Sequence, residues 1–122
     1  MELLKVEKSV KRAHPRVQAR IEAKLKMPGG RTIVTGQILN ISLGGLFIEM
    51  EEPLGFGKEF DLEFKLPDST LHCRGLVVWS TRTQPQMAEG RSGIGVRLMK
   101  IDVSEMRQLE SYISAHLETN NR

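Results

Sequence analysis

Three arginines follow one another at four-residue spacing near the start of the chain, at Arg12, Arg16 and Arg20. A guanidinium group binds a phosphate bidentately, pairs with the O6 and N7 edge of guanine, and stacks on the face of a base. The stretch therefore predicts either a solvated basic patch or a site for an anion. The spacing alone does not choose between the two, because a chain with 18 lysines and arginines produces it easily by chance.

A second group of candidate residues lies in "NISLGG", from Asn40 to Gly45. Asn40 and Ser42 are two residues apart at the end of an expected strand, so we expect their side chains to share one face. An amide and a hydroxyl together can read the edge of a base or hold a phosphate oxygen. Gly44 and Gly45 follow, where the backbone can take a positive φ and a ligand can approach closely. The alternative interpretation is an ordinary turn, which uses the same residue types.

Other kinds of chemistry find little support in the sequence. His14, His72 and His116 are scattered, and no cysteine or carboxylate stands at metal-ligand spacing from them, so no metal site is expected. Ser42 has no histidine–carboxylate arrangement beside it, so nucleophilic catalysis is not expected either. The glycines of "GIG", Gly93–Gly95, are too few for a dinucleotide-binding fingerprint. We expect a protein that is not an enzyme and that has no cofactor.

The composition is that of one globular domain, with 39% hydrophobic and 27% charged residues in a chain of 122. No apolar run reaches about 18 residues, and the charged N-terminus lacks the apolar core of a secretory signal, so we expect a cytoplasmic protein without a membrane span. Residues 1–31 hold nine Lys or Arg against three Glu, whereas the remainder holds nine against twelve acidic residues. An anionic partner would therefore be attracted to the N-terminal quarter.

The elements that position these residues are mainly strands. The segment from Glu59 to Leu66 alternates apolar and charged side chains, which is typical of an antiparallel strand covering a core. Cys73 is expected to be a small buried side chain, and Trp79 is expected to fill the core. Six strands are expected, over Val17 to about Leu25, Thr32 to Ile41, Leu46 to Met50, Glu59 to Leu66, Leu71 to about Arg82, and Gly93 to Met99.

One convincing helix follows the last expected strand. Asp102 can cap it, with Glu105 as the reciprocal partner of a capping box, and apolar residues recur at three- and four-residue steps as far as Leu117. Six short antiparallel strands and one helix predict a mostly β fold, a six-stranded antiparallel barrel with a C-terminal α-helix. We expect residues 1–11 to form a flexible basic arm and residues 12–118 to form the barrel domain, with its closing helix at about 103–118.

Taken together, these residues resemble the PilZ domain family, six-stranded β-barrels that bind the bacterial second messenger cyclic di-GMP. The family pattern has R-x-x-x-R just ahead of the first strand and [D/N]-x-S-x-x-G at the junction of the second and third strands. In this chain "RAHPR" supplies Arg12 and Arg16, and "NISLGG" supplies Asn40, Ser42 and Gly45. The likeness continues through "GLFIEM", "GLVVW" and "GIGVRL" and covers roughly residues 11–118.

The resemblance implies that cyclic di-GMP is held between the arginine pair and the segment Asn40–Gly45. It leaves Arg20, inside the first strand, as a solvated or structural side chain. The ligand-binding residues that it implies are Arg12, Arg16, Asn40, Ser42, Gly44 and Gly45, with Lys11 as an accessory cation.

The function implied is that of a receptor in motility or biofilm regulation. The ligand would bridge an arm of about residues 1–16 and the barrel rim, and so alter a surface that a downstream protein or a second copy in a homodimer contacts. One alternative is a PilZ-like adaptor that binds a pilus, flagellar or signalling protein without nucleotide. A barrel that binds RNA or DNA is less favoured, because aromatic residues are only 5% of the chain and the sequence after residue 31 is acidic.

Overall fold

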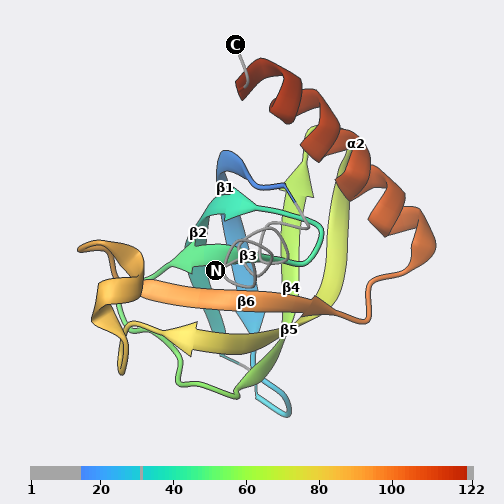
Figure 1. Cartoon of the computed structure of the whole chain (residues 1–122). Helices are drawn as coiled ribbons and strands as arrows, with labels where there is room; N and C mark the ends of the chain where they lie inside the picture. Colours follow the sequence, from blue (N-terminus) through green and yellow to red (C-terminus); the bar gives the residue numbers. More distant parts are fainter. Residues whose placement is uncertain (1–14, 31, 121–122) are drawn as a thin grey trace, which may run out of the picture.

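A computed structural model of the chain describes residues 15–30 and 32–120. Six strands and a C-terminal helix make up the fold, with a short 3₁₀-helix between the last two strands (Figure 1). The elements are β1 (Val17–Lys26), β2 (Ile33–Ile41), β3 (Gly45–Glu49), β4 (Glu59–Leu66), β5 (Ser69–Ser80), η1 (Pro85–Ala88), β6 (Gly93–Met99) and α2 (Val103–Asn120).

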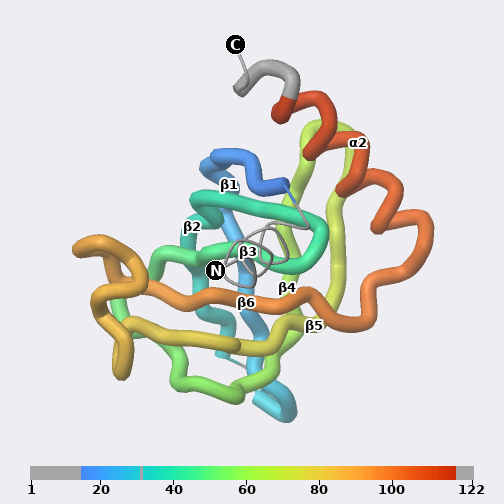
Figure 2. The backbone as a smooth tube through the Cα atoms, in the orientation of Figure 1, coloured from blue at the N-terminus to red at the C-terminus, as the bar shows by residue number. Residues whose placement is uncertain are grey.

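The six strands close into one antiparallel barrel in the order β1-β2-β3-β6-β5-β4, with β4 paired back onto β1. The backbone tube in Figure 2 follows this closed path. Closure pairs every strand on both sides and leaves no open sheet edge, which small β proteins otherwise have to protect. In this order β3 and β4 lie across the barrel from each other. The predicted mostly β fold, a six-stranded antiparallel barrel with a C-terminal helix, is confirmed.

The core is formed by the inward-facing side chains of all six strands and by one side of the helix. The alternation in β4 has the expected effect, because Phe60, Leu62 and Phe64 are buried in the core. The helix α2 lies across one end of the barrel (Figure 1), where Leu109 and Ile113 join the same hydrophobic cluster. No helix within residues 15–30 and 32–120 is long and apolar enough to cross a membrane.

The expected capping box at the start of α2 is only half present. The Asp102 carboxylate accepts a hydrogen bond from the backbone N–H of Glu105 at 2.8 Å, so the cap itself is confirmed. The Glu105 carboxylate, however, does not reach back to the cap but accepts a hydrogen bond from the backbone N–H of His72 in β5 at 3.0 Å. The side chain predicted to finish the helix end therefore ties the helix to the barrel wall.

Two core predictions had different outcomes. Cys73 is buried, and burial, followed by the nearby Glu105 charge, raises the pKa of its thiol to about 12. Trp79, in contrast, is only half-buried and does not belong to the core cluster. The prediction that Trp79 fills the core is wrong, because a register shift in β5 between Val77 and Trp79 re-aims its side chain.

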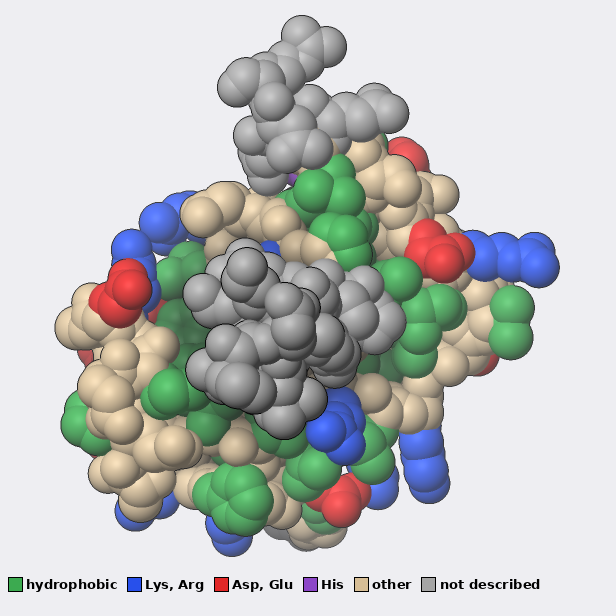
Figure 3. Space-filling model, viewed as in Figure 1, with side chains coloured by type: hydrophobic (Ala, Val, Ile, Leu, Met, Phe, Trp, Pro, Cys, Tyr) green, Lys and Arg blue, Asp and Glu red, His purple; other side chains and the backbone are tan. Residues whose placement is uncertain are grey.

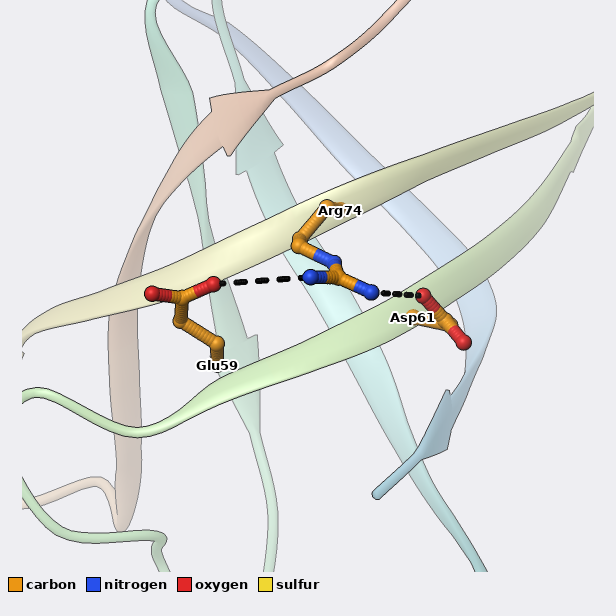
Figure 4. Close-up of polar contacts among 3 residues, drawn as sticks. All are labelled: Glu59, Asp61 and Arg74. Atoms are coloured by element: carbon orange, nitrogen blue, oxygen red, sulfur yellow. Dashed lines mark hydrogen bonds and ion pairs between the residues drawn. The ribbon is translucent and has the colours of Figure 1, made fainter. Parts of the chain in front are cut away.

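Charged side chains pair with one another on the outer surface of β4 and β5, which we call the paired face. Arg74 lies between Glu59 and Asp61, with N···O distances of 3.7 and 3.4 Å (Figure 4). His72 lies 3.4 Å from Glu63 on the same two strands. Cross-strand neighbours of opposite charge stabilise such a pair of antiparallel strands and satisfy each other. A hollow of about 460 Å³ opens over this face.

Candidate functional site

The two sequence motifs meet at the start of β1. The Arg16 side chain donates a hydrogen bond from Nη1 to the Asn40 Oδ1 atom at 3.0 Å, across 24 residues of chain. Strands β1 and β2 are antiparallel neighbours, and each has a register shift close to this point, after Gln18 in β1 and after Ile38 in β2. Such irregularities re-aim side chains beside functional sites. One arginine of the pair therefore lies against the predicted polar wall.

The rest of that wall is a tight turn held by Ser42. The Ser42 Oγ atom lies 3.2 Å from the backbone nitrogens of both Gly44 and Gly45, from which it accepts hydrogen bonds, and 3.2 Å from the Gly45 carbonyl oxygen. The Ser42 backbone N–H also donates to the Gly45 carbonyl at 2.8 Å. Ser42 is buried, so its hydroxyl fixes the shape of the turn. This is the turn interpretation that the residue types allowed.

Gly45 is required for a reason other than the expected one. The glycines with positive φ in the described chain are Gly29, Gly57 and Gly90, not the pair at 44 and 45. A Cβ atom on Gly45 would collide with the Val96 backbone carbonyl of the neighbouring strand β6. The glycine therefore allows β3 and β6 to approach each other closely.

Two aromatic rings cover the outer surface beside this turn. Trp79 of β5 stacks on Phe47 of β3, with ring centroids 5.5 Å apart and an interplanar angle of 13°. Trp79 pairs in register with Gly95 of β6, where a Cβ atom would collide with the indole. The same would happen between Phe47 and a Cβ atom on Gly93. The "GIG" sequence thus provides room for an aromatic pair on the outside of the barrel.

Arg16 and Trp79 separate two adjoining hollows. The smaller, which we call the Arg97 hollow, has a volume of about 170 Å³. The larger, which we call the Glu89 hollow, has a volume of about 390 Å³. Both are lined by Arg16 and Trp79; the first is also lined by Ser42, Gly44, Gly45 and Arg97, and the second also by Arg20, Asn40, Phe47 and Glu89.

Three arginines around these hollows lack carboxylate partners within the described chain, whereas Arg91, which also lines the Glu89 hollow, is paired with Glu49. Within residues 15–30 and 32–120, Arg16, Arg20 and Arg97 form no ion pair within 4.0 Å; we call the surface that carries them the cationic face. All three side chains are exposed. Figure 3 shows Lys and Arg side chains at several places on this side of the molecule, some beside hydrophobic side chains and some beside Asp or Glu. Guanidinium groups without internal anions are available to an external one.

The predicted site residues are thus brought together only in part. Arg16 and Asn40 contact each other, and Gly44 and Gly45 lie beside them, but Asn40 and Ser42 open on different hollows. Lys11 and Arg12 lie outside the described residues. The described part of the chain holds no group of three side chains that could bind a metal ion.

Three residues of this region were not assigned to the site from the sequence. The sequence predicts a solvated or structural role for Arg20 and a core position for Trp79, and it indicates no role for Glu89. A signal for Trp79 does exist, because alternate glycines within a strand mark the close approach of a large group from its neighbour. No comparable signal marks Arg20 or Glu89, whose positions depend on the register of β1 and on the path of the connection between β5 and β6.

Solved structures with a similar fold have low sequence identity to this chain. The inhibitor of motility MotI/DgrA from Bacillus subtilis superposes with a TM-score of 0.74 and 16% identity, covering 89% of this chain and 52% of the other. This chain therefore spans about half the length of that protein. The PilZ domain of YcgR from Escherichia coli, solved with c-di-GMP, has a TM-score of 0.65 and 14% identity, covering 88% and 92% of the two chains. The PilZ domain of CeSA from a cellulose-synthesizing bacterium has a TM-score of 0.57 and 19% identity, covering 82% and 95%.

These structural likenesses show a shared fold. A search of curated protein sequences found no match. A comparison with protein-family profiles matches the PilZ domain over residues 10–115. That match covers the whole barrel, the Arg16–Asn40 contact, the Ser42 turn and most of α2. The chain therefore belongs to the PilZ domain family.

Proposed function

We propose that this PilZ domain is a receptor for cyclic di-GMP, which binds on the cationic face between Arg16 and the segment Asn40–Gly45. The observation that carries the proposal is the 3.0 Å contact between Arg16 and Asn40, which joins the two halves of the motif. The absence of carboxylate partners for the arginines of this face in the described chain supports it. So does the YcgR PilZ domain of the same fold, which was solved with c-di-GMP.

The ligand carries two guanines and two phosphates, and the site offers partners for both. Arg16 can pair with the O6 and N7 atoms of guanine or with a phosphate oxygen. The exposed face of the Trp79–Phe47 stack offers a surface on which a base can lie. We assign Arg12 the role of a second guanidinium on the ligand, because it is the first arginine of the R-x-x-x-R pattern, and Lys11 that of an accessory cation, because it directly precedes Arg12.

The binding test is calorimetric titration of the full chain with cyclic di-GMP, with GTP and cyclic AMP as controls. We expect saturable binding of cyclic di-GMP and none of the controls at the same concentrations. Arg12→Ala is expected to weaken binding by about tenfold or more, because a bidentate arginine–guanine contact is worth about 1–3 kcal/mol. Failure of the unaltered chain to bind cyclic di-GMP would overturn the receptor proposal and favour an adaptor that works without nucleotide.

We further propose that binding engages the segment that precedes β1 and thereby changes the surface presented to a partner protein. The measurement is amide hydrogen exchange of residues 1–16 with and without saturating cyclic di-GMP. We expect slower exchange with ligand. Residues 59–66 of β4 serve as the internal control, because β4 lies across the barrel from β3 and lines neither hollow beside Arg16. Unchanged exchange in residues 1–16 would contradict this switch and leave the binding proposal intact.

A further inference from the structure

Glu89 stands in a backbone conformation that is uncommon for its residue type. It follows η1 directly, with φ of 50° and ψ of 53°, in the left-handed region that glycine or asparagine usually occupies. The next residue, Gly90, also has a positive φ of 89°. A bulky charged residue held in this conformation points to a functional constraint on its side chain.

Glu89 lines the Glu89 hollow, and it comes from a different part of the barrel than the two arginines. Arg16 and Arg20 belong to the start and the middle of β1, whereas Glu89 comes from the connection between β5 and β6. Strands β2 and β3 lie between these two elements in the barrel, and the Phe47–Trp79 stack occupies that interval. The hollow therefore has the two β1 guanidinium groups on one side and the Glu89 carboxylate on the other, with an aromatic surface between them. Arg91, two residues after Glu89, also lines the hollow, but it is paired with Glu49.

The Glu89 carboxylate is also free to bind. Among residues 15–30 and 32–120 it forms no ion pair within 4.0 Å and no side-chain hydrogen bond, although Arg16 and Arg20 line the same hollow. The nearby Glu49 differs in this respect, because its Oε2 atom lies 3.0 Å from Arg91 Nη1. One carboxylate of this region is thus neutralised by an arginine, and the other is left open.

This arrangement complements guanine in particular. Guanine presents two acceptors, O6 and N7, along one edge, which a guanidinium group satisfies, and donors at N1 and the 2-amino group along another. A carboxylate accepts hydrogen bonds only, so it can bind both donors at once. Adenine presents an acceptor at N1 and lacks the 2-amino donor, so a carboxylate placed there would repel it.

We propose that Glu89 is a specificity-determining residue that binds the N1 and 2-amino groups of one guanine of the ligand, while Arg16 or Arg20 faces the O6 and N7 edge of the same base. This inference rests on the proposed function and goes beyond the arginine and Asn-x-Ser motifs. It gives the region after η1 a role in distinguishing guanine from other purines.

The test compares the affinities for cyclic di-GMP and for cyclic di-IMP, whose hypoxanthine bases lack the 2-amino group. Glu89→Gln retains the size of the side chain but replaces one acceptor oxygen by a donor. Glu89→Gly removes the carboxylate and relieves the left-handed backbone, so it is expected to fold at least as stably as the unaltered chain. Glu52→Gln is the matched control, because Glu52 is an exposed carboxylate that lines a different hollow.

We expect the unaltered chain and Glu52→Gln to prefer cyclic di-GMP by about tenfold or more, as for a good bidentate base contact. Both Glu89 variants should lose most of this preference, chiefly by weaker binding of cyclic di-GMP. If cyclic di-GMP binds but the preference is absent, or is unchanged in both Glu89 variants, the role of Glu89 is wrong and the receptor proposal stands. If the unaltered chain binds neither nucleotide, the receptor proposal fails, and the role of Glu89 fails with it.

Discussion

Two regions of the barrel surface use charge in opposite ways. On the paired face, Arg74 lies between two carboxylates and His72 lies beside a third (Figure 4). On the cationic face, Arg16 contacts only the neutral amide of Asn40 among the described residues. Both regions carry a hollow, and the hollow over the paired face, at about 460 Å³, is larger than either hollow beside Arg16.

The size of a hollow is therefore a poor guide to the site in this protein. An anion that approached Arg74 would have to displace Glu59 or Asp61 from it, whereas an anion on the cationic face meets three arginines that are not paired with a carboxylate among the described residues. The difference indicates that the paired cations maintain the barrel wall and that the unpaired ones are available for a ligand.

The largest expected effect comes from removing one arginine from each region. Arg16→Ala should weaken cyclic di-GMP binding by about tenfold or more, since it removes a bidentate partner, whereas Arg74→Ala should change the affinity less than about twofold. Both variants lose one positive charge, so a general electrostatic effect would weaken binding equally in the two. The measurement is the affinity of each variant by calorimetry at the same ionic strength. Equal losses of affinity would contradict the difference between the paired face and the cationic face.

Adding a methyl group at Gly95 tests whether the aromatic pair belongs to the cationic face. Gly95→Ala places a Cβ atom against the Trp79 indole, which is half-buried and can swing outward. We expect destabilisation of about 1 kcal/mol, at the low end of the range for overpacking, and a several-fold loss of cyclic di-GMP affinity. Chemical denaturation and calorimetry measure the two quantities. Loss of stability with unaltered affinity would show that the indole only packs against the strand.

Cys73 tests whether the wall beneath the paired face is closed to water. Its pKa is raised to about 12, mainly by burial, against 9.0 for a free thiol, so the folded chain retains a proton that the unfolded chain loses. Stability should therefore fall as the pH rises from about 9 towards about 12, by at most about 1.4 kcal/mol at pH 10. Denaturation of the unaltered chain and of Cys73→Ala at pH 8 and pH 10 isolates the thiol. A difference between the two proteins that does not change with pH would contradict the burial.

The smallest effect is expected from the ion pairs themselves. A double-mutant cycle on Asp61 and Arg74 should give a coupling of about 0.2–1 kcal/mol at low salt and less at high salt, because both side chains are substantially exposed. The paired face would then contribute little to stability while still keeping its arginine away from ligands. A coupling that is large and insensitive to salt would show that the ion pairs of the paired face contribute substantially to the stability of the fold.

The fold was predictable from the sequence because the hydrophobic periodicity of each strand and of the helix is a local pattern. The alternation in β4 and the apolar stripe of α2 place Phe60 and Leu109 in the core without any knowledge of strand order. The ends of elements were less predictable. Strand β5 begins at Ser69, two residues before the expected start, because Leu66 and Ser69 pair directly across a two-residue turn. Which group Glu105 would bind depended on where β5 lies, and no local pattern contains that information.

Only the site residues that belong to the family motif were predictable from the sequence. Arg16 and Asn40 were identified through the family pattern, and their contact needed the antiparallel pairing of β1 with β2. Trp79 was misplaced because a β-bulge re-aims its side chain, and bulges leave little trace in the sequence. Glu89 carries no comparable signal, because its position depends on a loop rather than on a repeating pattern.

The position of Trp79 allows ligand binding to be followed by intrinsic tryptophan fluorescence. The chain contains one tryptophan, so its emission comes from a single place, between the two hollows beside Arg16. The single tyrosine, Tyr112, is on α2, where it packs against His116, and it lines neither of these hollows. A base that stacked on the indole would quench this emission in proportion to occupancy. Unlabelled protein would thus report binding in real time, and unchanged emission at saturating cyclic di-GMP would exclude stacking of a base on the indole.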